Sequence, residues 1–183
     1  MTIIVGYKTK KGLLFASDTQ CSSDEEKNMD TIEKVFKKNG VIFGVAGSIN
    51  LNNELKYNFD YKFKNLNDER ELYSSFRYEL KNFIKNADNC ITENNELDGQ
   101  LLIGINNNLY AFQCDLSITN VMKNYYCIGS GSSFALGSLY TSHNLSNIPI
   151  KKKLRLAIES AGEFSMGCNK EVRFYDYTNR PTE

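Results

Sequence analysis

The single histidine limits the hydrolytic chemistry that this chain could perform. His143 is the only imidazole among 183 residues, and most serine or cysteine hydrolases place an imidazole beside the nucleophile as its base. His143 follows Tyr140-Thr141-Ser142 at the expected end of a helix. The sequence also lacks the G-x-S-x-G motif that exposes a nucleophilic serine in many hydrolases. These features argue against a histidine-dependent hydrolase.

The cysteines do not have the spacing of a metal site. They are odd in number, widely separated, and never arranged as C-x-x-C or flanked by histidine: Cys21, Cys90, Cys114, Cys127 and Cys168. Zinc sites and disulfide frameworks both need closer or paired spacings. We therefore expect reduced, mostly buried thiols, with no metal and no cofactor.

Ser130 lies between two glycines, Gly129 and Gly131, immediately before a predicted helix. A glycine-rich turn of this kind can hold a phosphate at a helix N-terminus. Here the lysine and the rest of the phosphate-loop pattern are missing. A helix cap is the simpler interpretation, considered from these residues alone.

Two hairpins are predicted to begin the chain. The β-branched and apolar segments pair as residues 2–8 with 13–17, and as residues 32–38 with 41–46. Asn39-Gly40 is the strongest short turn signal in the sequence. A polar loop over residues 22–30 joins the two hairpins.

Two helices are predicted next. Leu51, Leu55, Phe59 and Phe63 recur every four residues, which favours a helix over residues 51–63. The alternation of aromatic residues over 57–63 leaves a strand open there. Asp68 or the preceding Asn67 can cap a second helix, whose apolar face is Leu72, Phe76, Leu80, Phe83 and Ala87.

The second half of the chain repeats this order of strands followed by helices. Strands are predicted over 100–105, 109–114, 118–122, 125–128 and 172–177, and helices over 132–142 and 151–166. Runs of strands followed by runs of helices fit antiparallel sheets better than alternating βαβ units. The predicted fold class is α+β, with helices covering two antiparallel sheets.

Composition narrows the possible partners. Lys plus Arg and Asp plus Glu both number 22, so net charge does not favour a nucleic acid or a charged membrane. No apolar run reaches the roughly 20 residues of a membrane span, and no signal peptide is recognisable. With 41% hydrophobic residues, residues 1–183 are expected to form one cytoplasmic domain.

Five segments, in this order along the chain, resemble the N-terminal nucleophile hydrolases of the proteasome family. They are Thr2-Ile3-Ile4-Val5-Gly6, Gly12 to Thr19 around Ala16-Ser17-Asp18, Glu33-Lys34-Val35-Phe36, Phe43 to Ser48 around Ala46-Gly47, and Ile128-Gly129-Ser130-Gly131-Ser132. The resemblance covers nearly the whole chain and implies a four-layer αββα sandwich. Within the family the chain looks most similar to the bacterial ATP-dependent protease subunit HslV and to phage or bacterial proteasome homologues, because only Met1 precedes Thr2.

The resemblance implies a threonine-type peptidase. Thr2 would supply the hydroxyl nucleophile and, once Met1 is removed, an α-amine as base, so that no imidazole is needed. Lys34 would lie beside Thr2, where its charge favours the neutral amine, and Asp18 would hold the ammonium from a neighbouring strand. Gly47 would donate its N–H to the oxyanion, and Ser130 would orient the amine.

Substrate-binding residues are also suggested by the family pattern. Val45 stands where the family places a wall of its main specificity pocket, with Cys21 and Ile32 expected nearby. These side chains would accept small or medium apolar groups. The expected substrates are peptides or unfolded proteins.

The sequence departs from the family near its end, in Gly162-Glu163-Phe164-Ser165-Met166-Gly167-Cys168. Proteasome subunits place an Asp and a Ser three residues apart beside the amine, whereas this register supplies Glu163 and Met166. The change argues for reduced activity. A weaker family feature is a small cation held by the carbonyls at positions matching Gly162, Ser165 and Cys168.

Three functions remain open at this stage. The first is a peptidase in stacked homo-oligomeric rings fed by an ATP-dependent unfoldase, an assembly that the resemblance alone implies. The second is a non-catalytic ring-forming scaffold, which the Met166 change and a retained Met1 would favour. The third is an acylase that hydrolyses a small amide with the same N-terminal nucleophile.

Overall fold

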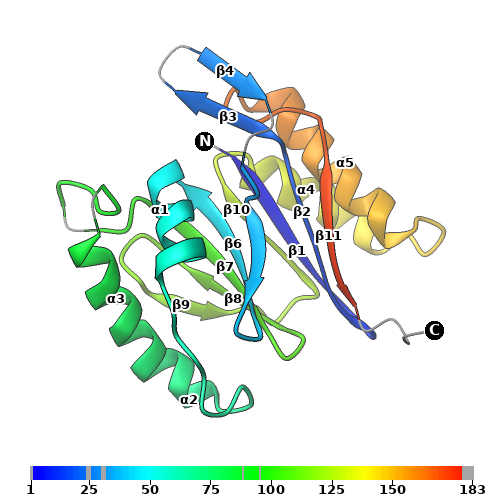
Figure 1. Ribbon diagram of the computed structural model, residues 1–183. Helices are drawn as coiled ribbons and strands as arrows, with labels where there is room; N and C mark the ends of the chain where they lie inside the picture. The colour runs from blue at the N-terminus through cyan, green and yellow to red at the C-terminus, as the bar shows by residue number, and fades with distance from the viewer. Residues whose placement is uncertain (1, 24–25, 30–31, 88, 95, 179–183) are drawn as a thin grey trace.

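The computed structural model describes residues 2–23, 26–29, 32–87, 89–94 and 96–178. Two antiparallel sheets face each other, and helices cover the outer face of each (Figure 1). This arrangement confirms the predicted α+β class and the four layers. None of the described helices combines the length and the hydropathy needed to cross a membrane.

The first sheet contains both the start and the end of the described chain. Its order is β10-β1-β2-β11, with every neighbouring pair antiparallel. Helices α4 (Ser132–His143) and α5 (Ile150–Phe164) cover its outer face (Figure 1). The strands are β1 (Ile3–Thr9), β2 (Gly12–Ser17), β10 (Tyr125–Gly129) and β11 (Arg173–Thr178).

The second sheet is a five-stranded antiparallel meander of order β5-β6-β7-β8-β9. Its strands are β5 (Val35–Lys38), β6 (Val41–Gly47), β7 (Gly99–Ile105), β8 (Asn108–Phe112) and β9 (Ile118–Asn120). The elements on its outer face are α1 (Ile49–Asn53), η1 (Glu54–Asn58), α2 (Glu69–Glu71), η2 (Leu72–Phe76) and α3 (Arg77–Asn86).

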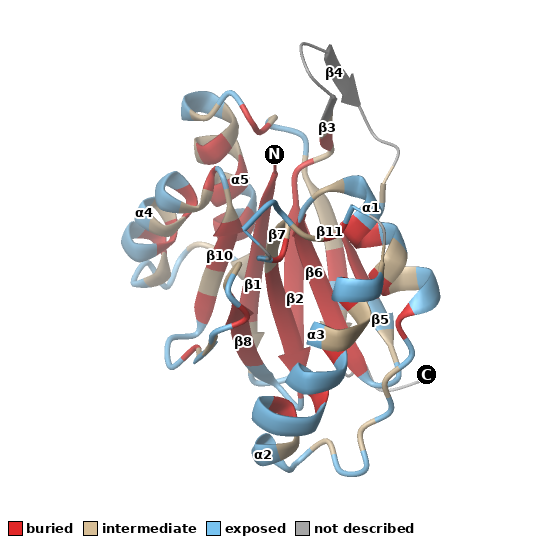
Figure 2. Cartoon of the chain, turned by 90° about the vertical axis from the view of Figure 1, so that its left-hand side faces the viewer, coloured by how far each residue is buried: buried red, intermediate tan, exposed pale blue. Residues whose placement is uncertain are grey.

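Apolar side chains fill three separate layers. Ile4, Phe15 and Leu102 belong to the layer between the sheets. A second cluster packs strands β1, β2 and β10 against helices α4 and α5. A third cluster, rich in phenylalanine, packs strands β6, β7 and β8 against the helices that cover the second sheet. Figure 2 accordingly shows buried strands and helices whose outer faces are exposed.

The predicted turn at Asn39-Gly40 is confirmed in detail, and a turn of the same kind joins β7 to β8. Asn39 and Gly40 have φ values of 49° and 82°, and Asn106 and Asn107 have 45° and 64°. Consecutive positive φ angles are those of a two-residue hairpin turn that matches the strand twist. These turns set the registers of β5 with β6 and of β7 with β8.

The helix predicted over residues 51–63 is wrong in its second half. Helix α1 runs into the π-helix η1, which ends at Asn58, and Phe59 is already extended at φ −75° and ψ 114°. Phe59 nevertheless remains buried against Phe76 and Phe83. The apolar spacing therefore predicted burial correctly, although the backbone that achieves it is not helical.

Other boundaries also moved. The strand predicted to begin at Ile32 begins at Val35, and the helix predicted to reach Met166 ends at Phe164. The predicted loop over 22–30 overlaps a hairpin of β3 (Gln20–Ser23) and β4 (Glu26–Met29), which projects beyond the first sheet (Figure 1). Residues 24–25 and 30–31 of this region lie outside the described chain.

Candidate active site

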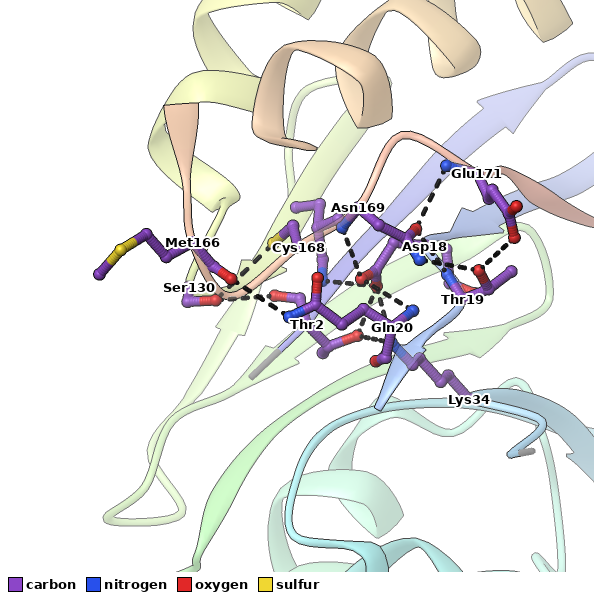
Figure 3. Close-up of polar contacts among 12 residues, drawn as sticks. Thr2, Asp18, Thr19, Gln20, Lys34, Ser130, Met166, Cys168, Asn169 and Glu171 are labelled. Carbon is purple, nitrogen blue, oxygen red and sulfur yellow. Dashed lines mark hydrogen bonds and ion pairs between the residues drawn. The ribbon is translucent and has the colours of Figure 1, made fainter. Parts of the chain in front are cut away.

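Thr2 and Asp18 are brought together by the first hairpin. Thr2 directly precedes β1 and Asp18 directly follows β2, and the Asp18 N–H donates to the Ile3 carbonyl at 3.2 Å. The Thr2 hydroxyl donates to Asp18 Oδ1 at 2.6 Å (Figure 3). Both residues are buried.

Lys34 reaches the same point from the opposite sheet. It directly precedes β5, and its carbonyl accepts from the Val45 N–H at 2.9 Å. The expectation that Asp18 holds the ammonium from a neighbouring strand is therefore wrong, because Lys34 precedes β5, an edge strand of the second sheet. The site lies where the two sheets meet at one end of the sandwich (Figure 1).

The Lys34 ammonium uses all three of its N–H donors on these groups. Nζ donates to the Thr2 hydroxyl oxygen, to Asp18 Oδ1 at 2.7 Å and to the Gln20 carbonyl at 2.6 Å. A buried charge is tolerated only when it is paired and fully hydrogen-bonded. The Thr2 oxygen is thus held between a cation and a carboxylate.

Asp18 organises the site through both carboxylate oxygens. Oδ1 also accepts from the Ile3 N–H at 3.1 Å, and Oδ2 accepts from the Gln20 and Asn169 N–H groups at 3.3 and 3.4 Å. The Gln20 side-chain amide continues the network to the Met166 carbonyl at 3.1 Å. The segment after α5 is thereby attached to the end of β2.

Ser130 lies against the backbone of Thr2. Its hydroxyl donates to the Thr2 carbonyl at 3.3 Å and lies 3.7 Å from Cys168 Sγ. Burial, with a further contribution from the Asp18 charge, raises the pKa of the Cys168 thiol, which therefore stays neutral at physiological pH. The predicted contact of Ser130 with the Thr2 amine is not among the described interactions, and Met1 lies outside the described residues.

Gly47 is required by the close pairing of β6 with β7. It pairs with Gly99, and a Cβ at Gly47 would overlap the carbonyl oxygen of Asp98. The same residue lines a cavity that also reaches Thr2. Gly47 therefore lies at the cavity with no side chain between its backbone and a bound molecule.

A cavity of about 590 Å³ opens beside Thr2. Cys21, Ile32 and Val45 line it, together with Ile49 and Asn52 of α1. Its volume lies in the range of small-molecule and peptide side-chain sites. The opposite wall includes Gln100 of β7 and the turn at Gly129.

Glu163 and Met166 contribute no side chain to the described site. Glu163 forms an exposed ion pair with Lys170, and Met166 is 86% exposed. In Figure 3 the Met166 side chain points away from Thr2. The family register had suggested that Glu163 lies near the amine, and its side chain lies elsewhere. Asn169 instead supplies its backbone N–H to Asp18, and its side-chain Oδ1 accepts from the Thr19 N–H at 3.2 Å.

Sequence reasoning missed Gln20, Gln100 and Asn169. Gln20 and Asn169 act at the site through backbone groups as well as side chains, and backbone groups leave no signature in residue type. Gln100 could have been found, because a polar residue at the start of the apolar strand 100–105 needs a partner.

The carbonyl of Ser165, one of the suggested cation ligands, accepts from the Cys168 N–H at 3.2 Å.

No group of three or more His, Cys, Asp or Glu side chains within the described chain could hold a metal ion. The charged groups at the centre of the site are Lys34 and Asp18, which neutralise each other. The groups that meet at the centre of the site are the Thr2 hydroxyl, the Lys34 ammonium and the Asp18 carboxylate.

Solved structures with the same fold come from bacteria and from a eukaryote. Thiobacillus denitrificans BPH aligns with a TM-score of 0.76 at 17% identity, covering 98% of this chain and 100% of that one. The same protein in complex with epoxomicin gives 0.74 at 17% identity, covering 95% and 97%. HslV from Trypanosoma brucei gives 0.66 at 14% identity, covering 95% and 98%. These identities show a shared fold.

No curated protein matches the sequence significantly. The model described as "Proteasome subunit" matches residues 2–175, which begin at Thr2 and include all of the site described above. The chain therefore belongs to the proteasome subunit family.

Proposed function

We propose that this chain is a threonine peptidase whose nucleophile is the Thr2 hydroxyl. The observation that carries the proposal is the contact of the buried Lys34 ammonium with the Thr2 oxygen, beside a cavity that reaches it. A cation next to a hydroxyl stabilises the developing alkoxide, and Asp18 keeps that cation in place. The proposal includes removal of Met1, which frees the Thr2 amine.

We propose the following reaction for these residues. The Thr2 oxygen attacks the carbonyl carbon of a peptide bond while the Thr2 amine takes the hydroxyl proton. The oxyanion is stabilised by the Gly47 N–H, and the amine then gives the proton to the departing amine of the product. Water, deprotonated by the same amine, hydrolyses the acyl ester and regenerates Thr2.

We propose that the substrate side chain on the N-terminal side of the cleaved bond is bound by Cys21, Ile32 and Val45. They line the cavity next to Thr2, and their apolar surfaces favour small or medium apolar groups. Peptides and unfolded proteins are the proposed substrates. A fluorogenic peptide series that varies this side chain would measure the preference as kcat/KM.

A non-catalytic family subunit is the second candidate. The exposed side chains of Glu163 and Met166 favour it, because neither side chain reaches the described site. Such a subunit would keep the buried Lys34–Asp18 pair for stability alone. The two candidates differ in whether Thr2 reacts.

Peptide hydrolysis by the wild type, Thr2→Ala and Lys34→Ala separates these candidates. We expect Thr2→Ala to abolish turnover and Lys34→Ala to reduce kcat by about 100-fold or more, the scale of lost electrostatic stabilisation. Equal cleavage by wild type and Thr2→Ala would show that the nucleophile is misassigned. Epoxomicin, which is bound in one of the similar structures, should inhibit the wild type if the sites act alike.

Intact mass tests the processing step independently of substrate choice. A mass lacking Met1 supports the peptidase, because only then is the Thr2 amine free to act as base. Retention of Met1 on the purified protein supports the scaffold. A Thr2→Ser variant serves as the control, since serine keeps both the hydroxyl and a small second residue.

We further propose that the chain assembles into stacked homo-oligomeric rings that enclose the Thr2 sites and receive substrates from an ATP-dependent unfoldase. Membership of the proteasome subunit family supports this assembly. Size-exclusion chromatography with light scattering measures it directly. A monomer at every tested concentration would contradict the ring proposal and leave the Thr2 chemistry to be judged by turnover.

A further inference from the structure

Gln100 connects the two sheets beside the proposed nucleophile. It lies on β7 in the second sheet, and its side-chain Oε1 accepts a hydrogen bond from the Gly129 N–H at 3.0 Å. Gly129 is the last residue of β10 in the first sheet. A single side chain therefore spans the gap between the halves of the site.

The orientation of this amide is set by a second glutamine. Gln100 Nε2 donates to Gln113 Oε1 at 2.7 Å. An amide that donates to one fixed acceptor must present its oxygen on the other side. Gln113 therefore holds the Gln100 oxygen toward the Gly129 N–H.

Gly129 transmits this constraint to Thr2. It pairs with Ile3, and a Cβ at Gly129 would overlap the Thr2 carbonyl oxygen. The next residue, Ser130, donates its hydroxyl to that same carbonyl. A displacement of the chain at Gly129 would therefore also displace the backbone of Thr2.

Gln100 is equally close to the other half of the site. It pairs with Ala46 across β6 and β7, directly beside the pairing of Gly99 with Gly47. A Cβ at Gly129 would lie 3.3 Å from Ala46 Cβ, so the two sheets touch at this position. Gln100 therefore bonds across this contact, beside the residue next to Gly47 on one sheet and the turn that touches Thr2 on the other.

We propose that Gln100 is a positioning residue that sets the separation between the nucleophile on one sheet and the Gly47 oxyanion donor on the other. This inference rests on the proposed peptidase function. Because transition-state stabilisation requires donor and nucleophile to be placed within a fraction of an ångström, loss of this bond lowers kcat while the apolar side-chain cavity keeps KM nearly constant.

The test compares Gln100→Met with Gln100→Glu. Methionine has a similar length and no acceptor for the Gly129 N–H. Glutamate keeps an acceptor oxygen for that N–H but loses the donor to Gln113 Oε1. We expect kcat for peptide hydrolysis to fall about tenfold or more in Gln100→Met, with KM within about twofold, and to recover in part in Gln100→Glu. Tyr110→Phe, on the neighbouring β8, is the control for a general change in this sheet.

Hydrogen–deuterium exchange provides a readout that does not depend on turnover. The peptide containing Gly129 should lose protection in Gln100→Met and regain it in Gln100→Glu. If Gln100→Met changes the exchange but the wild type hydrolyses no peptide, the result contradicts the peptidase proposal and leaves Gln100 as a hydrogen bond between the sheets. Unchanged kcat with unchanged exchange in Gln100→Met overturns the inference.

Gln113→Ala covers the case in which Gln100→Met fails to fold. It leaves the Gln100 oxygen in place and removes only the acceptor that orients the amide. We expect a smaller fall in kcat and a local loss of Gly129 protection. If Gln113→Ala keeps full kcat and full protection at Gly129, the proposed orientation of Gln100 is wrong.

Discussion

Lys34 carries a positive charge into the protein interior, where it bonds only to groups of the site. Asp18 is its counter-charge and is itself fully buried. Neither partner can be removed without leaving the other charge in a region of low dielectric. The stability of the fold and the chemistry proposed for Thr2 therefore depend on the same ion pair.

Asp18→Asn should destabilise the protein by about 3–5 kcal/mol, the cost of leaving a buried charge unpaired. Equilibrium unfolding in urea measures this loss. Glu163→Gln is the matched control, because its ion pair with Lys170 is exposed and should contribute less than about 1 kcal/mol. Similar losses in both variants would mean that the Lys34–Asp18 pair adds little to stability.

At the scale of elements, the site depends on how closely β6 approaches β7. Gly47 and Gly99 pair at the end of the second sheet, and Gly99 has a φ of 152°, which favours glycine. A side chain on Gly47 would press against the Asp98 backbone, which cannot move away as a flexible side chain could. This local closeness brings the Gly47 backbone to the cavity.

Gly47→Ala is therefore expected to lower the free energy of unfolding by about 1–3 kcal/mol and to reduce peptide turnover. Gly137→Ala is the contrasting variant, because a Cβ there meets nothing within 4 Å on helix α4. It should stabilise the protein by about 0.5–1 kcal/mol through its higher helix propensity. Thermal unfolding of both variants tests the pair, and equal effects would contradict the steric explanation.

An element's boundaries could be predicted from the sequence where a particular residue type is needed for the local backbone conformation. The turns at Asn39-Gly40 and Asn106-Asn107 were predictable because positive φ values select asparagine and glycine. The cap at Asp68 was also predictable, since its side chain accepts from the Arg70 N–H at 3.0 Å. The end of η1 at Asn58 was not, because Phe59 is buried whether its backbone is helical or extended.

The candidate site shows the same division. Residue types and spacing, matched to the family, indicated Thr2, Asp18 and Lys34, which the structure brings together. The sheet that carries Lys34 was mistaken, since strand pairing between distant segments is set by tertiary packing. The roles of the Gln20 carbonyl and the Asn169 N–H could not be predicted, because every residue type has these groups.

For the whole molecule, the core contains several groups that resist ionisation. Burial raises the pKa of Cys127 and Cys168, with the Asp18 charge adding to the effect at Cys168, and burial is the first cause that raises the pKa of Tyr110 and Tyr177 to about 12. Each of these groups is therefore neutral in the folded protein at pH 7. A raised folded-state pKa means that the folded protein keeps its proton at a pH where the unfolded chain has lost it.

These groups should consequently leave stability unchanged between pH 7 and about pH 8.5, where they are protonated in both states, and lower it as the pH rises further. Tyrosines should steepen this loss above about pH 10. Urea unfolding between pH 7 and pH 10.5 measures the slope, and Cys127→Ala should reduce the slope between pH 8.5 and 10. A stability that stays flat to pH 10 would show that burial does not protect these thiols.

The first strand lies in the middle of its sheet, between β10 and β2, and Asp18 is bonded by the backbone of Asn169 near the opposite end of the chain. Because translation proceeds from the N-terminus, Thr2 and Asp18 are synthesised well before Asn169. Until that later segment emerges, Asp18 lacks the N–H of Asn169. The nucleophile that we propose would therefore acquire its complete surroundings only late in the synthesis of this region.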